Sequence, residues 1–188
     1  MTNANAMKPG VPNAPWFCLR DAETDCWLVF ASPVRTIEAR TTNEVLPALG
    51  EIERATQEEG LHAAGFVSYE AAPAFDAVLP AKRDNRFPLL WFGLFAAPKR
   101  MEDSWASPSD HAVELNWESA LPDGAYRRRV EAVREYIRRG DTYQVNLTHR
   151  LRAACPRLCA WDLFRQLMGG QPPPFAAFAD IGEWAVCS

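Results

Sequence analysis

Residues Gly124 to Ala153 read GAYRRRVEAVREYIRRGDTYQVNLTHRLRA, and this stretch decides the fold that the sequence predicts. Its first part repeats apolar residues with the period of a helix, and its second part alternates as a strand does. The apolar positions of the expected helix follow i, i+4, i+7 and i+11 spacing, and they are Tyr126, Val130, Val133 and Ile137. Because arginines and acids occupy the other sides, we expect this apolar face to be buried.

Both ends of this helix are marked in the sequence. Asp123 is placed to cap the first turn, and Gly140 follows Arg138 and Arg139. Cations therefore lie at the negative end of the helix dipole, directly before a residue that tolerates the left-handed conformation. After Asp141 the period changes to two, which predicts a strand. One side of that strand carries Tyr143, Val145 and Leu147, and the other carries Gln144, Asn146 and Thr148.

The composition is that of a globular chain long enough for one sizeable core. Its 188 residues are 48% hydrophobic, and the net charge is −4 with a pI near 5.4. With arginines mostly matched by nearby acids, we expect neither nucleic acid nor an anionic membrane as partner. No apolar run approaches the ~20 residues that a membrane span needs, and no basic-then-apolar leader is visible. We therefore expect a cytoplasmic protein.

The five cysteines form no disulfide framework. Their number is odd and their spacing irregular, which favours free thiols in a reducing compartment. Cys155 and Cys159 with His149 match no common zinc pattern and lack a fourth ligand. We therefore expect structural thiols there and no metal.

The first part of the chain predicts a sheet and one helix. After a disordered tail over 1–15, three short strands are expected as an antiparallel meander, at Trp16–Leu19, Cys26–Ala31 and Val34–Ala39. Thr42 or Asn43 can cap a helix that ends at Gly60 and whose apolar positions are Val45, Leu46, Leu49 and Ile52. A strand over Leu61–Tyr69 contains Gly65, which indicates a close approach of another backbone or a bulge.

The remaining elements are expected in the following order. They are a short helix or turn at Glu70–Val78, a central strand at Leu89–Phe95, a mobile connector at Pro98–Asp110, a strand at Val113–Trp117, a helix at Trp161–Met168 ended by Gly169-Gly170, an extended run at Gln171–Pro174, and a hairpin of Phe175–Ala179 with Trp184–Cys187. Because the last strand reaches Ser188 without a turn or cap, we expect an exposed edge and a truncated domain. We divide the chain into 16–110, an N-terminal sheet and helix region, and 111–188, the start of a second domain.

Two sequence runs together resemble a known family. They are Phe66-Val67-Ser68-Tyr69-Glu70-Ala71-Ala72-Pro73 and Gly140-Asp141-Thr142-Tyr143-Gln144-Val145-Asn146-Leu147-Thr148. The sequence contains no phosphate-binding loop, nucleophile elbow or metal-binding signature. Its three histidines lie in separate segments and indicate no particular reaction. The two runs resemble the chorismate-utilising enzymes, which include component I of aminodeoxychorismate synthase (para-aminobenzoate synthase) and component I of anthranilate synthase. The second run is closer to the aminodeoxychorismate branch, and the likeness extends from about Trp16 to Ser188.

The resemblance implies an α/β (α+β) fold: a two-sheet β-sandwich with flanking helices of the anthranilate synthase component I type, present as its N-terminal part. It implies a reaction that replaces the C4 hydroxyl of chorismate with ammonia, for para-aminobenzoate and folate biosynthesis. A glutamine amidotransferase subunit would supply the ammonia. Mg²⁺ would bridge the substrate carboxylate and enzyme glutamates, as suits a hard cation with oxygen ligands.

The family's reacting groups have no counterpart in this sequence. The Pro-Ile-Lys-Gly-Thr run, whose lysine is the family's proposed nucleophile, does not occur. The family's catalytic histidine, metal-binding glutamates and substrate arginine lie in its C-terminal half, after a Ser-Pro-Glu run. We therefore assign no catalytic residue and no metal ligand within 1–188, and we expect this segment alone to be inactive as a synthase.

One ligand site of the family falls partly inside the chain. Relatives hold tryptophan between their first strands and an Asn-Pro-x-Pro-Tyr-Met run. Here the corresponding runs are Leu19-Arg20-Asp21-Ala22 and Gln171-Pro172-Pro173-Pro174-Phe175-Ala176. Asp21 could pair with a ligand ammonium, while Pro174 and Phe175 could enclose an indole. A turn acid and a polyproline connector are the alternative interpretation.

Three other functions stay open at this point. The parent enzyme could be component I of anthranilate synthase, which the residue at the downstream nucleophile position would distinguish: lysine in the aminodeoxychorismate branch, alanine in the anthranilate branch. The segment could instead be a non-catalytic module that binds tryptophan or docks a subunit. The remaining alternative is a generic α/β domain.

Overall fold

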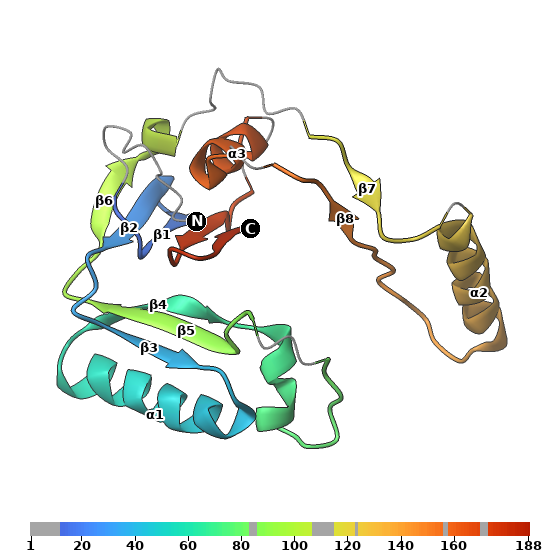
Figure 1. Cartoon of the computed structure of the whole chain (residues 1–188), viewed down its shortest axis with the longest axis horizontal. Helices are drawn as coiled ribbons and strands as arrows, with labels where there is room; N and C mark the ends of the chain where they lie inside the picture. The colour runs from blue at the N-terminus through green and yellow to red at the C-terminus, as the bar shows by residue number, and fades with distance from the viewer. Residues whose placement is uncertain (1–11, 83–85, 107–114, 123, 156–157, 170–172) are drawn as a thin grey trace. The chain divides into compact units, whose positions relative to one another are not determined.

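The computed structural model describes residues 12–82, 86–106, 115–122, 124–155, 158–169 and 173–188. The chain divides into two compact units, one formed by Met1–His111 with Cys159–Ser188 and the other by Ala112–Leu158. Both units combine helices with antiparallel sheets (Figure 1). The mixed α/β fold predicted from the sequence is therefore confirmed. Within the described residues, no helix combines the length and the apolar character that crossing a membrane requires.

The first unit contains a five-stranded sheet in the order β10-β9-β1-β2-β6. Its strands are β1 (Trp16–Asp21), β2 (Cys26–Ala31), β6 (Lys99–Glu102), β9 (Ala177–Asp180) and β10 (Ala185–Cys187). All four pairings are antiparallel. The hairpin of β9 and β10 turns at Gly182, whose φ of 93° lies in the region that favours glycine. This confirms the predicted hairpin and places β10 at an edge of the sheet.

A second sheet of the same unit has three strands in the order β3-β5-β4. They are β3 (Arg35–Ala39), β4 (His62–Val67) and β5 (Leu90–Phe95). The central position of β5 confirms the prediction from its apolar sequence. Gly65 on β4 also confirms the expected close approach. A Cβ atom at this position would overlap the carbonyl oxygen of Trp91 and lie 2.6 Å from the Cα atom of Phe92.

The helix α1 (Thr42–Glu58) covers the three-stranded sheet. Its buried face is Val45, Ala48, Ile52 and Ala55, whereas Leu46, expected on that face, is exposed. The N-cap is Thr41 and not Thr42 or Asn43, because the Glu44 carboxylate turns back to accept the backbone N–H of Thr41 at 2.9 Å. Gly60, with φ of 66°, follows the helix end as predicted.

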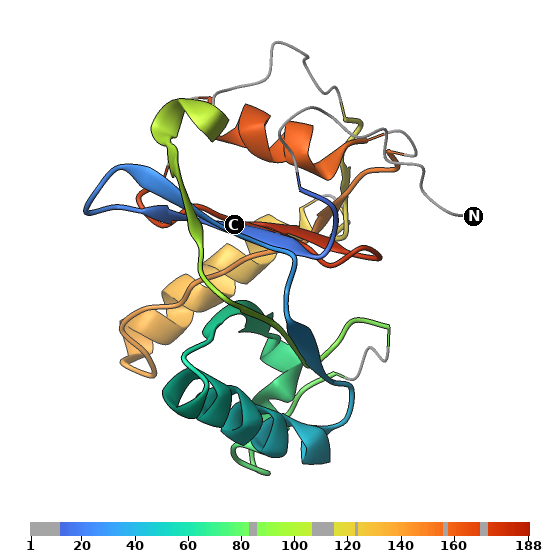
Figure 2. The same ribbon diagram turned by 90° about the vertical axis from the view of Figure 1, so that its left-hand side faces the viewer.

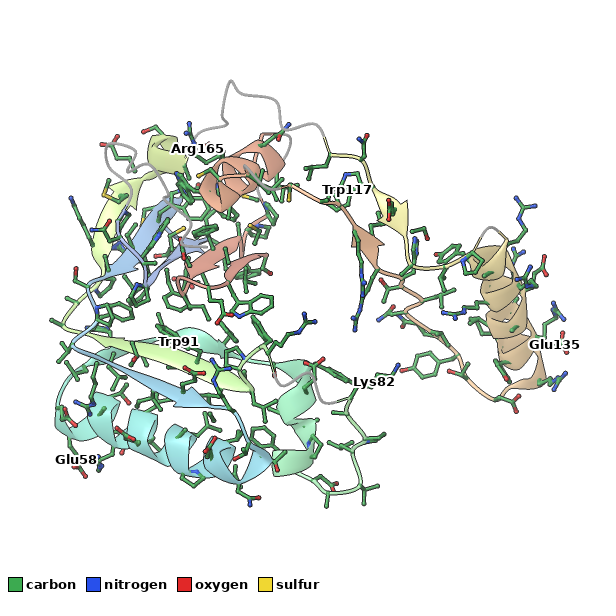
Figure 3. All side chains as sticks on the ribbon, in the orientation of Figure 1. Glu58, Lys82, Trp91, Trp117, Glu135 and Arg165 are labelled. Atoms are coloured by element: carbon green, nitrogen blue, oxygen red, sulfur yellow. The ribbon has the colours of Figure 1, made fainter. Side chains whose placement is uncertain are left out.

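Three apolar clusters order the first unit into layers (Figure 2). One lies between α1 and the three-stranded sheet, and a second lies between the two sheets, where Figure 3 labels Trp91 of β5. The third joins the five-stranded sheet to α3 (Ala160–Leu167), and its largest side chains are Trp16, Trp27, Trp161, Phe164 and Phe178. The predicted helix at 161–168 and the two-sheet core are thus confirmed.

Two predictions for the first unit are wrong. Only the first two expected strands form a hairpin: β3 pairs with β5 in the other sheet, because the chain turns at Ser32 with φ of 55° and Pro33 lacks a backbone donor. The expected mobile connector at Pro98–Asp110 contains β6 and the short 3₁₀ helix η2 (Asp103–Ala106). The short helix or turn expected at Glu70–Val78 is, in contrast, confirmed as a 3₁₀ helix, η1 (Tyr69–Ala74).

The second unit consists of α2 (Ala125–Arg139) and a ribbon of β7 (Glu118–Ser119) with β8 (Leu151–Arg152). The helix and its stop at Gly140, with φ of 80°, confirm the prediction. Its N-cap is Gly124. Asp123, the cap expected from the sequence, lies outside the described residues. The apolar face of α2, expected to be buried, has no buried residue. The expected strand after Asp141 is absent, because residues 142–149 have no strand partner among the described residues.

Several further expectations fall partly outside the described residues. They are the tail over 1–15, the strand at Val113–Trp117, whose described residues 115–117 form no strand, and the extended run at Gln171–Pro174. The last segment, 159–188, belongs to the sheet of the N-terminal region in this structure. The division of the chain between 110 and 111 stays a prediction.

Candidate functional site

The candidate site lies where the end of β1 meets the start of β9. The two strands pair Leu19 with Ala177, and the backbone N–H of Arg20 donates to the carbonyl oxygen of Ala176 at 2.8 Å. The paired residues end at Leu19 and Ala177, so Phe175 lies outside the strand register. A turn precedes β9, closed by the N–H of Ala176 donating to the carbonyl oxygen of Pro173 at 3.2 Å. The structure therefore brings together two segments that are far apart in the sequence.

The carboxylate of Asp21 is held by hydrogen bonds from its own turn. One oxygen accepts the backbone N–H of Glu23 at 3.1 Å, and the other accepts the hydroxyl of Thr24 at 2.6 Å. These bonds, with the Thr24 hydroxyl first, lower the pKa of Asp21 below its ordinary value. Asp21 is consequently a fixed anion at neutral pH.

A cation from a distant strand lies beside this anion. Arg100 of β6 donates from Nη2 to Oδ2 of Asp21 at 3.0 Å, and its side chain is 58% exposed. Arg20 points to the other face of the sheet, where its guanidinium donates to Asp25 at 3.1 Å. Asp21 and Arg100 thus present adjacent opposite charges on one face of the five-stranded sheet.

Apolar surface adjoins this ion pair on the same face. The side chains of Leu19 and Asp21 share that face because they are two residues apart on one strand. Leu19 is 37% exposed and Phe175 is 82% exposed. Paired charges next to a partly exposed leucine suit a zwitterion with an apolar side chain: the ligand carboxylate can meet Arg100, and its ammonium can meet Asp21.

Of the three site residues predicted from the sequence, Asp21 ends β1, and Pro174 and Phe175 lie exposed in the turn that precedes β9. The backbone bond from Arg20 to Ala176 joins the residue before Asp21 to the residue after Phe175. Sequence reasoning missed Arg100 and Thr24. The only signal for Arg100 was Met101, a single apolar residue among charged ones, which is too little to indicate a strand.

The second family-like run lies in the other unit and forms no site by itself. The hydroxyl of Thr142 donates to the carbonyl oxygen of Gln144 at 3.0 Å, and the Gln144 amide donates to Asn146 at 3.3 Å. Tyr143 is 91% exposed. These hydrogen bonds join residues within the run itself.

The described residues offer no fit for the divalent cation that the resemblance implies. Across that part of the chain, no three side chains of His, Cys, Asp or Glu come together as a metal site would require. All five cysteines are free thiols, and burial raises the pKa of Cys187 to about 11. We therefore derive no step through a metal from these residues.

Comparison with known sequences gives one family and several relatives. Residues 14–188 match the model of a family described as chorismate binding enzyme. The chain is 33% identical to aminodeoxychorismate synthase component 1 of Escherichia coli strain K12 over 89 residues, which are 47% of this chain and 19% of that protein. It is 32% identical to anthranilate synthase component 1 of Streptomyces coelicolor over 77 residues, 41% of this chain and 15% of the relative.

A third relative aligns over most of the chain. It is the aminodeoxychorismate synthase of Streptomyces griseus, 29% identical over 171 residues, which are 90% of this chain and 20% of that protein. In each of the three comparisons, the matched region covers no more than 20% of the relative. The matched part of this chain therefore corresponds to a small part of each relative.

Proposed function

Since the chain belongs to the family of chorismate binding enzymes, we propose that it is the N-terminal part of an aminodeoxychorismate synthase component I. The parent enzyme would replace the C4 hydroxyl of chorismate with ammonia, giving 4-amino-4-deoxychorismate for para-aminobenzoate and folate. The parent enzyme would be cytoplasmic, and a glutamine amidotransferase subunit would supply the ammonia. Mg²⁺, held by residues outside 1–188, would neutralise the substrate carboxylate.

Similarity over the length of the chain carries this proposal. The alignment that covers 90% of the chain is with an aminodeoxychorismate synthase, and two further relatives named aminodeoxychorismate synthase component 1 are 33% and 36% identical over shorter stretches. The run from Gly140 to Leu147 has the Gln-Val-Asn-Leu form of that branch. Both observations favour amination at C4.

Within the parent enzyme, we assign residues 1–188 the role of scaffold and of amino-acid binding. The Asp21–Arg100 ion pair, together with the exposed ring of Phe175 in the turn that leads into β9, supports the second role. The ligand class is an aromatic α-amino acid, with tryptophan as the expected member. Its carboxylate would bind Arg100, its ammonium would bind Asp21, and its ring would lie against Phe175 and Leu19.

Product analysis tests the proposed reaction. The parent polypeptide is incubated with chorismate, Mg²⁺ and ammonium, and the products are separated and weighed by mass spectrometry. We expect 4-amino-4-deoxychorismate, which aminodeoxychorismate lyase converts to para-aminobenzoate. Residues 1–188 alone, used as the control, should form neither compound. Anthranilate as the sole product would overturn the proposal.

The second candidate is component I of anthranilate synthase. It is favoured by relatives of that name, including the protein of Streptomyces coelicolor and the pyocyanine-specific protein of Pseudomonas aeruginosa, which is 27% identical over 86 residues. The same incubation separates the two candidates, because anthranilate is fluorescent and needs no lyase. The nucleophile position in the parent gene gives an independent answer, lysine for the first candidate and alanine for the second.

A further inference from the structure

The apolar face of α2 is open in the second unit. Of the four residues that form its stripe, Tyr126 and Ile137 are each 42% exposed, and Val130 and Val133 are only half-buried. The helix as a whole has no buried residue. A face of this width is normally covered in a folded protein, because apolar side chains are stabilised by leaving water.

The segment that returns from α2 is open as well. Residues 142–149 make no backbone-to-backbone hydrogen bond to any described residue, and Tyr143 and Val145 are 91% and 43% exposed. The segment contacts the helix through the rings of Tyr126 and His149, whose centroids are 5.2 Å apart. An alternating apolar row whose backbone has no ladder partner among the described residues is suited to pair as a strand with another segment.

The second unit has no core of its own among the residues described. None of 115–122, 124–155 and 158 is buried, and the ribbon of β7 and β8 has two residues in each strand. A two-stranded ribbon and a single 15-residue helix are each marginal in water. Something outside this unit must therefore stabilise α2 and the returning segment.

The charges beside the stripe indicate the chemistry of what covers it. With 100° between successive residues, Arg129 and Arg134 lie on its two sides, and Glu135 lies on the opposite side of α2, turned away from the returning segment (Figure 3). Arg138 and Arg139 pair with Glu135. No ion pair joins Arg129 or Arg134 to a described residue. A second copy of this face would bring like charges together, whereas a surface with an acidic rim would neutralise them.

We propose that the α2 stripe and the row of Tyr143, Val145 and Leu147 form the docking surface for the part of the chorismate-binding fold that the relatives carry outside their matched segment. The alignment that spans 90% of this chain uses 20% of the relative, so the family has a large remainder that could supply the cover. The covering part presents an apolar strand or helix face with aspartate or glutamate at its rim. This inference rests on family membership and not on which reaction the parent enzyme performs.

Hydrogen exchange with mass spectrometry tests the proposal in two polypeptides. One is residues 1–188, and the other is the whole product of the gene that encodes them. In residues 1–188 we expect fast exchange over 125–147, beside protected amides in α1. In the whole product we expect protection over 125–147 to rise on the order of 100-fold. Equal protection in both, a gene that ends at Ser188, or a concentration-dependent dimer of 1–188 would each overturn the proposal.

A matched pair of variants separates docking from ordinary stability. Val133→Asp lies in the stripe, and Arg128→Asp lies on the far side of the same helix. In the whole product, Val133→Asp should abolish the added protection over 125–147, and Arg128→Asp should keep it. In residues 1–188 alone, neither should change the thermal midpoint. A Val133→Asp variant that lowers the midpoint of residues 1–188 would show that this chain covers the face itself, and the proposal would fail. Neither measurement uses chorismate. A negative result would therefore contradict the docking proposal without bearing on the proposed reaction.

Discussion

The backbone N–H of Arg20 donates to the carbonyl oxygen of Ala176 at 2.8 Å, and this bond joins the first strand of the chain to its last hairpin. The segment 159–188 is therefore part of the N-terminal sheet, and not only of the region that follows residue 110. In the same unit, α3 packs against Trp16 and Trp27 of the five-stranded sheet in one buried apolar cluster.

Phe164→Ala should destabilise the first unit strongly. The side chain is fully buried, and its ring lies 5.4 Å from that of Phe178 and 5.7 Å from that of Trp27. Removing it leaves a cavity between α3 and the sheet, so the free energy of unfolding in urea should fall by about 3–5 kcal/mol. Leu167→Ala, at a position that is 57% exposed on the same helix, is the control and should change it little. Equal losses in both variants would show that α3 does not pack as described.

Gly65→Ala should lower stability, whereas Gly50→Ala should raise it. A methyl group at Gly65 meets the backbone of Trp91 and Phe92 on the neighbouring strand, and the strand pairing leaves no room to move. We expect a loss of about 1–3 kcal/mol. Gly50 lies in α1 with no atom within 4 Å of an added Cβ, so alanine should stabilise the helix by about 0.5–1 kcal/mol. Thermal unfolding of both variants measures the difference, and a tolerated Gly65→Ala would contradict the close approach.

The elements that could be predicted from the sequence are those whose pattern is local. The 3.6-residue period of α2, the glycine stop at Gly140 and the apolar run of β5 each carry their own signal, and each element is present. Whether the α2 face is covered is a different question, because it depends on which other polypeptide lies against it. Periodicity shows that a face needs cover and says nothing about the source of that cover.

The errors at β3 and β6 have a similar cause. Which sheet β3 joins depends on the partner strand β5, more than fifty residues further on. Arg100 enters the candidate site because β6 pairs with β2, and the polar sequence of β6 contains one apolar residue. Asp21 and Phe175 could be named from a family resemblance, but the ion pair of Asp21 with Arg100 could be found only from the order of strands in the sheet.

Asp21→Asn should weaken the binding of tryptophan. The variant keeps the size of the side chain and removes the charge that would pair with the ligand ammonium, so affinity should fall at least about tenfold. Glu23→Gln is the control, because Glu23 contacts Asp21 only through its backbone N–H. Calorimetric titration of both variants and the unaltered chain gives the affinities. Absence of heat with the unaltered chain, or an unchanged affinity in Asp21→Asn, would rule out amino-acid binding at this place.

Stability should decrease as the pH falls from about 5 to 2. Hydrogen bonds from the backbone of Arg40 and Thr41 lower the pKa of Glu44, and the guanidinium of Arg35 lowers that of Glu59. The pKa of Asp21 is lowered as well. A carboxyl group whose pKa is lower in the folded state stabilises the fold above its unfolded pKa of about 4, and this contribution is lost as the pH falls through the folded pKa.

Glu44→Gln should remove part of this pH dependence. The variant loses the charged acceptor that holds the N–H groups of Arg40 and Thr41, at 2.8 and 2.9 Å, so its thermal midpoint should be lower at pH 7 and approach that of the unaltered chain near pH 2. Glu58→Gln is the control, because Glu58 makes no hydrogen bond or ion pair with a described residue. Midpoints measured by tryptophan fluorescence from pH 7 to 2 compare the three chains. If the midpoints of Glu44→Gln and of the unaltered chain change in parallel with pH, this carboxylate does not stabilise the first turn of α1.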